Sequence, residues 1–345
     1  MPRPGRSTRE DGSMPRPIDA DRLAFHRLVF ARRRSGWWTP LAVGALGLVF
    51  YLVMLGVVLV VTLVLTLAGG PAADAVEQLS TGAILDTSSP FALALALGTI
   101  ALMLPAYVLA SRIVNGPRVG FVTAVYGRMR WRWLLVCGGL SVATVVVVTA
   151  ISLLLPADDA GADAGPSGAT VWVSLVVILL LVPVQATAEE YVFRGYLMQA
   201  IGRWLRHPLF AILLPVPLFV IGHLYDPVGQ VGVGAFAVAA GWLTWRTGGL
   251  EAAIALHVVN NLLAFSFDLA GRGDAAATEV GWTSLVTSLL LIGLYCAAVE
   301  LVLRRRPITR TYRMARPPLP APIPMPTPTA TVPLPGEPRP NLTRP

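Results

Sequence analysis

The segment ATVWVSLVVILLLVPVQATAEEYVFR, residues 169–194, joins an apolar run directly to two carboxylates and a guanidinium. A run of about 20 apolar residues is long enough to cross the hydrocarbon core of a bilayer as a helix. An ionisable side chain at that depth costs about 3 kcal/mol or more, so it is rare unless it faces a partnered interior. Glu189, Glu190 and Arg194 are therefore candidates for a functional site.

Two further polar clusters follow inside apolar sequence. Residues 219–223 read FVIGH, and residues 257–261 read HVVNN. The first and last residues of each cluster are four apart, as are Glu190 and Arg194, and residues with that spacing share one face of a helix. The three clusters can therefore point their polar groups into a common interior.

The composition of the whole chain is that of an integral membrane protein. The 345 residues are 55% hydrophobic and 13% charged, with a mean hydropathy of +0.66, which lies outside the usual range of soluble domains. The net charge of +8 does not indicate nucleic acid, because the arginines gather at the ends of apolar runs. Cys137 and Cys296 each fall in an expected span, which argues against a disulfide framework or a cysteine zinc site.

The apolar pattern predicts an all-α polytopic membrane protein, a bundle of about eight transmembrane helices around a polar intramembrane cavity. The first four spans are each long enough to cross the hydrocarbon core, whereas the next four are shorter or broken by Pro and Gly and carry polar residues. The expected spans are, in order, residues 39–68, 90–111, 133–155, 169–188, 208–224, 228–245, 249–267 and 282–303.

Three parts of the chain follow from this pattern. Residues 1–36 are expected to be an Arg-rich cytoplasmic segment, in which a removable signal peptide is not evident. Residues 37–306 are expected to be the transmembrane domain, and residues 307–345 a basic, then Pro-rich cytoplasmic tail. The stretch 317–345 has proline at 12 positions, so it is expected to be disordered and polyproline-like.

The distribution of charge predicts the orientation. Arginines cluster before the first span, after the second and after the last, and the alternate loops are acidic. Because Arg is enriched in cytoplasmic loops, we expect a multi-pass protein of the cell membrane with both termini cytoplasmic.

The spacing within the clusters also predicts different roles for the two adjacent carboxylates. Glu189 lies about 100° around the helix from Glu190, so the two carboxylates have different roles. If Glu190 pairs with Arg194, its charge is compensated, and Glu189 is free to take a proton from water with His223 beside it. His257 and Asn261, which share a face, then serve as donors toward an oxyanion. The alternative is a purely structural role for these residues: Glu190 and Arg194 would be a buried ion pair that fixes a helix, and the asparagines would only join helices by hydrogen bonds.

The span boundaries conflict with this chemistry at one point. If residues 169–188 run fully inward and residues 208–224 run fully outward, Glu189 and His223 lie at opposite edges of the membrane. They share a water only if residues 189–205 bend or continue deeper, or if the segment 208–226 is displaced.

The three motifs, in this order, resemble the CPBP family (CAAX-processing and bacteriocin-processing, or Abi) of intramembrane endopeptidases. Its pattern is Glu-Glu-x-x-x-Arg, then Phe-x-x-x-His, then His-x-x-x-Asn, and the resemblance covers about residues 169–267. It implies a peptide hydrolase whose water is activated by Glu and His and whose oxyanion is stabilised by His and Asn. Matched to this chain, the catalytic residues are Glu189, His223, His257 and Asn261, and the supporting residues are Glu190, Arg194, Phe219 and Asn260.

Alternatives remain for the mechanism and for the function. Glu189, His223 and His257 could supply three ligands of a divalent metal such as zinc, although the lack of a His-Glu-x-x-His helix favours a metal-free mechanism. The expected partners are membrane lipid and a peptide or protein substrate, and nucleic acid is not expected. The alternative function is a non-catalytic bacteriocin-immunity or membrane scaffold protein of the same fold, and a transporter or proton channel is a weaker third.

Overall fold

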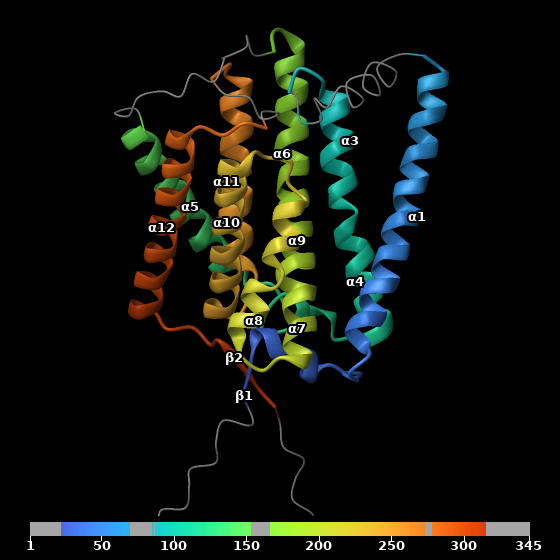
Figure 1. Ribbon diagram of the computed structural model, residues 1–345, viewed down its shortest axis with the longest axis vertical. Helices are drawn as coiled ribbons and strands as arrows, with labels where there is room; N and C mark the ends of the chain where they lie inside the picture. Colours follow the sequence, from blue (N-terminus) through green and yellow to red (C-terminus); the bar gives the residue numbers. More distant parts are fainter. Residues whose placement is uncertain (1–21, 70–84, 86, 153–165, 273–277, 315–345) are drawn as a thin grey trace, which may run out of the picture. The chain divides into compact units, whose positions relative to one another are not determined.

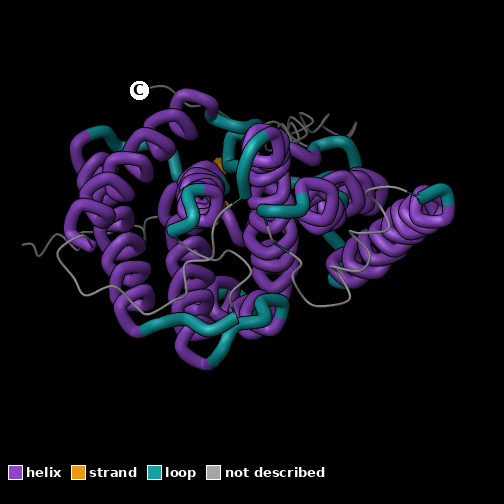
Figure 2. Tube along the Cα trace, turned by 90° about the horizontal axis from the view of Figure 1, so that it is seen from above, coloured by secondary structure: helices purple, strands orange, loops and turns teal. Residues whose placement is uncertain are grey.

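The computed structural model describes residues 22–69, 85, 87–152, 166–272 and 278–314, and these residues form a bundle of helices (Figures 1 and 2). Within them, seven helices are long and apolar enough to cross a membrane, which confirms the all-α polytopic fold. They are α1 (Thr39–Leu67), α3 with α4 (Pro90–Ala101 and Met103–Asn115), α5 (Trp131–Ser152), the helix that begins with α6 (Ala169–Glu190), α10 (Pro227–Thr247), α11 (Glu251–Leu269) and α12 (Trp282–Arg305). The Pro-rich tail and most of the acidic loops lie outside the described residues.

The fourth helix is longer than its hydropathy predicts. It does not end at residue 188 but continues through a π-helical segment, η3 (Tyr191–Leu197), into α7 (Met198–Trp204), so that one 36-residue helix runs from residue 169 to residue 204. The predicted boundary is wrong because it placed the end of the span at the first carboxylate. No proline follows Pro183 in this helix, and the carboxylates find partners inside the bundle.

The predicted span at residues 208–224 is also wrong. Residues 208–224 form two short helices, α8 (Pro208–Leu213) and α9 (Val216–Ile221), instead of a crossing helix. Together they are an apolar helical stretch of fewer than 18 residues, which at 1.5 Å per residue covers only about 20 Å of the roughly 30 Å that a span requires. Pro215 and Pro217 lie at the break between them, as the sequence predicts.

These two corrections remove the conflict between Glu189 and His223. The chain descends 15 residues from Glu189 to Trp204, turns, and ascends 15 residues from Pro208 to His223 (204 − 189 and 223 − 208). At 1.5 Å per residue each arm is roughly 22 Å long, and α7 packs against α8. The hairpin therefore returns His223 to the level of Glu189 without crossing the bundle.

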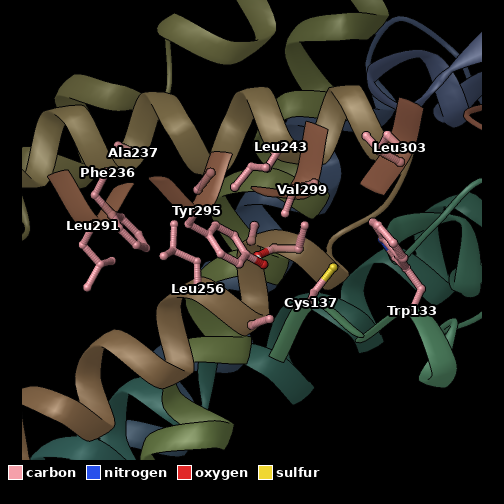
Figure 3. Close-up of a cluster of buried hydrophobic side chains, with 14 of the residues drawn as sticks. Trp133, Cys137, Phe236, Ala237, Leu243, Leu256, Leu291, Tyr295, Val299 and Leu303 are labelled. Atoms are coloured by element: carbon pink, nitrogen blue, oxygen red, sulfur yellow. The ribbon is translucent and has the colours of Figure 1, made fainter. Parts of the chain in front are cut away.

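The centre of the bundle is the contact between α6 and α11. Helix α11 also packs against α5 and α10, and α12 closes that side by packing on α5 and α10. The largest apolar cluster lies there (Figure 3), with Tyr295 fully buried and its hydroxyl donating to the carbonyl of Ala252 at 2.9 Å. Cys137 packs in the same cluster as a small apolar side chain. Helix α1 packs mainly on α4 and lies at the edge of the bundle (Figure 1).

Short elements join the two ends of the described chain. Strand β1 (Arg22–Ala24) leads into a 3-10 helix, η1 (Phe25–Ala31), that packs against α7, and β1 pairs antiparallel with β2 (Thr311–Arg313). A further 3-10 turn, η2 (Val119–Val122), lies beside η1. The N-terminal and C-terminal flanks of the bundle therefore meet at one end (Figure 1).

Candidate active site

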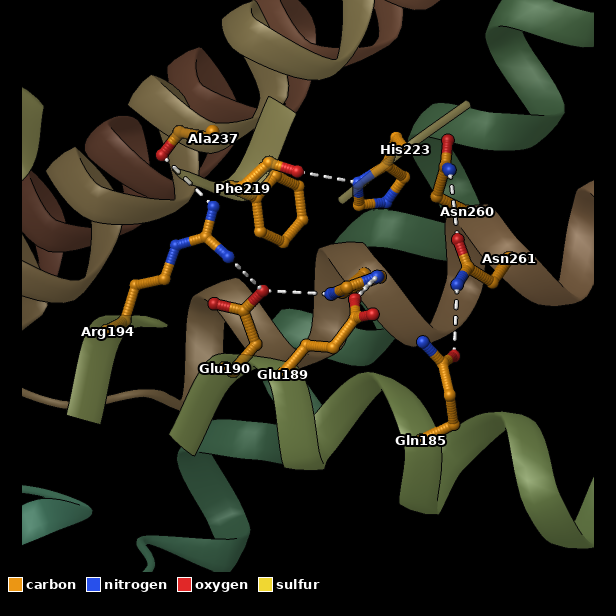
Figure 4. A network of polar contacts seen from close by, with 10 residues as sticks. Gln185, Glu189, Glu190, Arg194, Phe219, His223, Ala237, Asn260 and Asn261 are labelled. Carbon is orange, nitrogen blue, oxygen red and sulfur yellow. Dashed lines mark hydrogen bonds and ion pairs between the residues drawn. The ribbon is translucent and has the colours of Figure 1, made fainter. Parts of the chain in front are cut away.

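Glu190 is the centre of a buried polar network (Figure 4). Its side chain is 0% exposed, and its Oε1 accepts hydrogen bonds from Arg194 Nη1 and from His257 Nδ1, each at 2.8 Å. The guanidinium of Arg194 also donates to the carbonyl of Ala237 at 3.2 Å and stacks on the ring of Phe219, with its Cζ 4.4 Å from the ring centre. This network joins α6, η3, α9, α10 and α11.

The π-helical segment begins directly after Glu190. Such segments are rare and frequently occur at functional sites. The i, i+4 spacing of Glu190 and Arg194 still brings the two charges into contact, as the sequence predicts. The ion pair is fully enclosed by the aromatic rings of Phe219 and Phe236, which both lie near the guanidinium.

His257 lies between the two adjacent carboxylates. Its Nδ1 faces Glu190, and its Nε2 is 3.3 Å from Oε2 of Glu189, an ion-pair distance without hydrogen-bond geometry. Because an ionised carboxylate only accepts, Nδ1 carries the proton that is shared with Glu190. The cluster thus brings two carboxylates, one imidazole and the guanidinium of Arg194 into contact inside the bundle.

Glu189 differs from its neighbour in exposure. Its side chain is 10% exposed, whereas that of Glu190 is 0% exposed. Oε2 of each carboxylate is buried without a hydrogen-bond partner, but only Glu190 accepts hydrogen bonds, through its Oε1. The two adjacent carboxylates therefore differ in exposure and in partners.

His223 is half-buried at the end of α9. Its Nδ1 is 2.8 Å from the carbonyl oxygen of Phe219, and since a carbonyl only accepts, Nδ1 is the donor. The neutral ring then carries its lone pair on Nε2, which can accept a proton or a hydrogen bond from water. The ring of Phe219 contacts both imidazoles, with ring centres 4.6 Å from His223 and 6.3 Å from His257. Within the described residues, no ion pair or hydrogen bond joins His223 directly to Glu189.

The asparagines form a chain of amides that reaches back to α6. Asn260 Nδ2 donates to Asn261 Oδ1 at 3.4 Å, and Asn261 Nδ2 donates to Gln185 Oε1 at 3.3 Å (Figure 4). The sequence analysis missed Gln185, which is buried and lies four residues before Glu189. A polar residue on the Glu189 face of an apolar run is the signal that could have found it.

The three residues considered for zinc do not form a ligand set in this conformation. Across the part of the chain that the structure describes, no three His, Cys, Asp or Glu side chains are grouped closely enough to hold a metal ion. Glu189 Oε2 and His257 Nε2 are close to one another, but His223 is not grouped with them, and the other ring nitrogen of His257 faces Glu190. The donor set therefore does not fit a three-ligand zinc site.

Fold and site together define a multi-pass membrane protein with a buried cluster of carboxylates, imidazoles and a guanidinium. Comparison with known proteins agrees: residues 170–263 match the family described as "Type II CAAX prenyl endopeptidase Rce1-like", which confirms the resemblance to the CPBP family over this region. The chain is also 29% identical over 171 residues to the "Uncharacterized protein YyaK" of Bacillus subtilis (strain 168), a match that covers 48% of this chain and 57% of that protein. No solved structure matches.

Proposed function

We propose that this protein is an intramembrane endopeptidase that hydrolyses a peptide bond of a membrane-associated or hydrophobic peptide. One observation carries the proposal: Oε1 of Glu190 accepts hydrogen bonds from both Arg194 and His257, while the adjacent Glu189 accepts none within the described residues and lies beside the same imidazole. A purely structural ion pair needs only the first carboxylate. The second has a chemical use as a general base.

The proposed reaction begins with a water molecule between Glu189 and His223. Glu189 takes one proton from this water, and the other O–H of the water donates a hydrogen bond to Nε2 of His223. The resulting hydroxide oxygen attacks the peptide carbonyl carbon. Nε2–H of His257 and the amide of Asn261 donate to the oxyanion that forms. Glu189 then returns the proton to the leaving amine, so that a carboxylic acid and an amine are released and the enzyme is regenerated.

The supporting residues hold these groups in place. Glu190 fixes the ring of His257, and Arg194 donates a hydrogen bond to the same carboxylate oxygen. Phe219 anchors His223 through its carbonyl and separates the two imidazoles. Asn260 and Gln185 fix the amide of Asn261 from both sides. Locking of catalytic side chains by a second layer of contacts is typical of active sites.

The proposal places the protein in the cell membrane with both termini cytoplasmic, following the arginine distribution. Membrane lipid and a peptide or protein substrate are its partners. The metal-free mechanism requires that activity survive removal of divalent ions by a chelator.

A non-catalytic immunity or scaffold protein is the second candidate. The hydrogen bond from Asn261 to Gln185 favours it, because it joins α11 to α6 without requiring any catalytic role. The two functions differ in what they require of Glu189 and His223, which contribute little to this framework.

The deciding experiment is cleavage of a quenched library of hydrophobic peptides by the purified protein in proteoliposomes, beside Glu189→Gln. The endopeptidase predicts that Glu189→Gln lowers turnover on the order of 10³-fold without lowering the melting temperature. Glu300→Gln, the same change at the far end of α12, is the matched control and should cleave at the parental rate. Equal turnover in the parent and Glu189→Gln, or no cleavage of any peptide by the parent, would favour the scaffold.

A further inference from the structure

A second site lies at the end of the bundle where the termini meet. It is a cavity of about 570 Å³ between β1, the last turn of α10 and the segment 308–313, which includes β2, and its volume is in the range of small-ligand sites. We call it the arginine pocket. Its polar lining consists of Arg22, Arg246, Arg310, Arg313, Thr309 and Thr311. None of these residues belongs to the candidate active site.

The lining of the arginine pocket, as far as the structure describes the chain, is positively charged. Among the described residues no carboxylate lines it, and Glu300 binds Nη2 of Arg246 at 2.8 Å from outside the lining. Nη1 of the same guanidinium is buried without a hydrogen bond. Four arginines of the described chain therefore line the pocket, and Glu300 pairs with one of them.

The β-ribbon adds an independent sign that an anion belongs here. In the register of β1 and β2, Arg22 lies directly opposite Arg313. Like charges in directly opposite positions destabilise a strand pair. The central pair of the ribbon, Leu23 and Tyr312, packs in an apolar cluster and offsets part of this repulsion. A bound anion between the two guanidinium groups would turn the repulsion into attraction.

A close backbone contact holds the segment before β2 against the end of α10. Gly248 follows α10 with a φ of +73°, and a Cβ built there would lie 2.8 Å from the Cα of Arg310. Only glycine therefore allows the segment before β2 to lie against the end of α10. The pocket depends on a close contact that a larger residue would disrupt.

The level of the pocket in the bundle indicates the source of the anion. Trp245 and Arg246 are in the last turn of α10, and Arg304 and Arg305 are in the last turn of α12. Both helices are long enough to span the membrane, so their ends lie where Trp and Arg meet lipid headgroups. Basic pockets between transmembrane helices at this level are suited to anionic lipid headgroups.

We propose that the arginine pocket binds the phosphate-bearing headgroup of an anionic phospholipid and that this lipid holds β1 and β2 together. The threonine hydroxyls and arginine guanidinium groups donate to the phosphate oxygens. Arginine suits this role because its planar fork of donors matches phosphate. The lipid thus links the N-terminal and C-terminal flanks to the membrane.

The test uses the purified full chain in detergent, with phosphatidylglycerol as the probe and phosphatidylcholine of the same acyl chains as the uncharged control. Thermal unfolding and native mass spectrometry report binding. Each arginine near an anionic headgroup contributes about a five-fold factor in affinity. Replacing Arg22, Arg310 and Arg313 together by Gln therefore weakens phosphatidylglycerol binding on the order of 100-fold and abolishes the rise in melting temperature.

The matched control removes three exposed arginines that do not line the pocket, through Arg112→Gln, Arg128→Gln and Arg132→Gln. It should keep the parental response to phosphatidylglycerol, and an equal loss in this control would overturn the proposal in favour of nonspecific attraction. Inorganic phosphate at the same concentration should have no effect. An equal shift with phosphate would overturn the lipid assignment.

A single replacement separates binding from misfolding. Arg313→Gln removes the repulsion with Arg22, so it should raise the lipid-free melting temperature while it reduces the shift caused by phosphatidylglycerol. A fold defect would lower the lipid-free value instead. If Arg313→Gln leaves the lipid response unchanged, the proposal is wrong.

Discussion

Replacing Arg194 by Met tests whether Glu190 is an ionised, permanently compensated carboxylate. The substitution keeps an unbranched side chain beside Phe219 but removes the hydrogen bonds to Glu190 Oε1 and to the carbonyl of Ala237. Glu190 is 0% exposed, so water cannot solvate its carboxylate once the guanidinium is removed. Removing one partner of a buried ion pair costs about 3–5 kcal/mol, which corresponds to a fall in melting temperature on the order of 10 °C.

The double variant Glu190→Gln/Arg194→Met completes the cycle. Without the carboxylate there is no buried charge to leave unpaired, so the double variant should be more stable than the sum of the two single changes predicts by at least about 1 kcal/mol. His257 can still donate from Nδ1 to the amide oxygen that replaces the carboxylate. The assay is thermal unfolding of the purified variants in one detergent, followed by intrinsic tryptophan fluorescence.

The pair of Arg304 and Glu300 supplies the control cycle. The two residues have the same i, i+4 spacing, but Arg304 is 75% exposed and the distance is 3.3 Å, so Arg304→Met should cost no more than about 1 kcal/mol. The reasoning about Glu190 is refuted if Arg194→Met and Arg304→Met have similar effects. It is also refuted if the buried cycle is additive, because the two charges would then not depend on one another.

Two further predictions concern the contact between η1 and α7. A Cβ on Gly202 would overlap the carbonyl oxygen of His26, so Gly202→Ala should lower the free energy of unfolding by about 1–3 kcal/mol. Gly139→Ala is the control, because a Cβ there meets no neighbouring atom. Equal melting temperatures for the two variants would contradict the contact. The Nε2 of His26 lies 3.0 Å from the carbonyl oxygen of Arg206. Burial lowers the pKa of His26, so its imidazole binds a proton more weakly in the folded protein than in the unfolded chain. Stability should therefore be full above about pH 6.5 and fall as the pH drops through the lowered pKa, and melting curves from pH 8 to pH 5 should show a smaller decline in His26→Gln than in the parent.

Several features of the fold and site could be predicted because they depend on local spacing. The apolar composition predicts the membrane bundle, and the i, i+4 rule predicts the contact of Glu190 with Arg194. The same rule placed His257 and Asn261 on one face of α11, and both face α6 in the structure through Glu190 and Gln185. These relations involve residues within one or two helical turns, where helix geometry alone fixes the distance.

Other features could not be predicted because they depend on partners far away in the chain. The position of His257 between two carboxylates requires α11 to pack on α6 in one rotation, and the spacing within either helix does not define that rotation. The β-ribbon joins Arg22 to Arg313 across almost the whole described chain. A strand of three residues has too weak a pattern to be recognised without its partner.

The wrong boundary at residue 188 shows how the site and the fold depend on each other. Hydropathy ends a span at Glu189 because it assigns each carboxylate the cost of an isolated charge. In the structure Arg194 and His257 compensate the two carboxylates, so the helix continues and carries Glu189 into the interior. Had the helix ended there, Glu189 would lie among headgroups and bulk water, beyond the reach of His223. The residues that mislead a hydropathy argument are thus the ones that form the site, as expected where function overrides local preference.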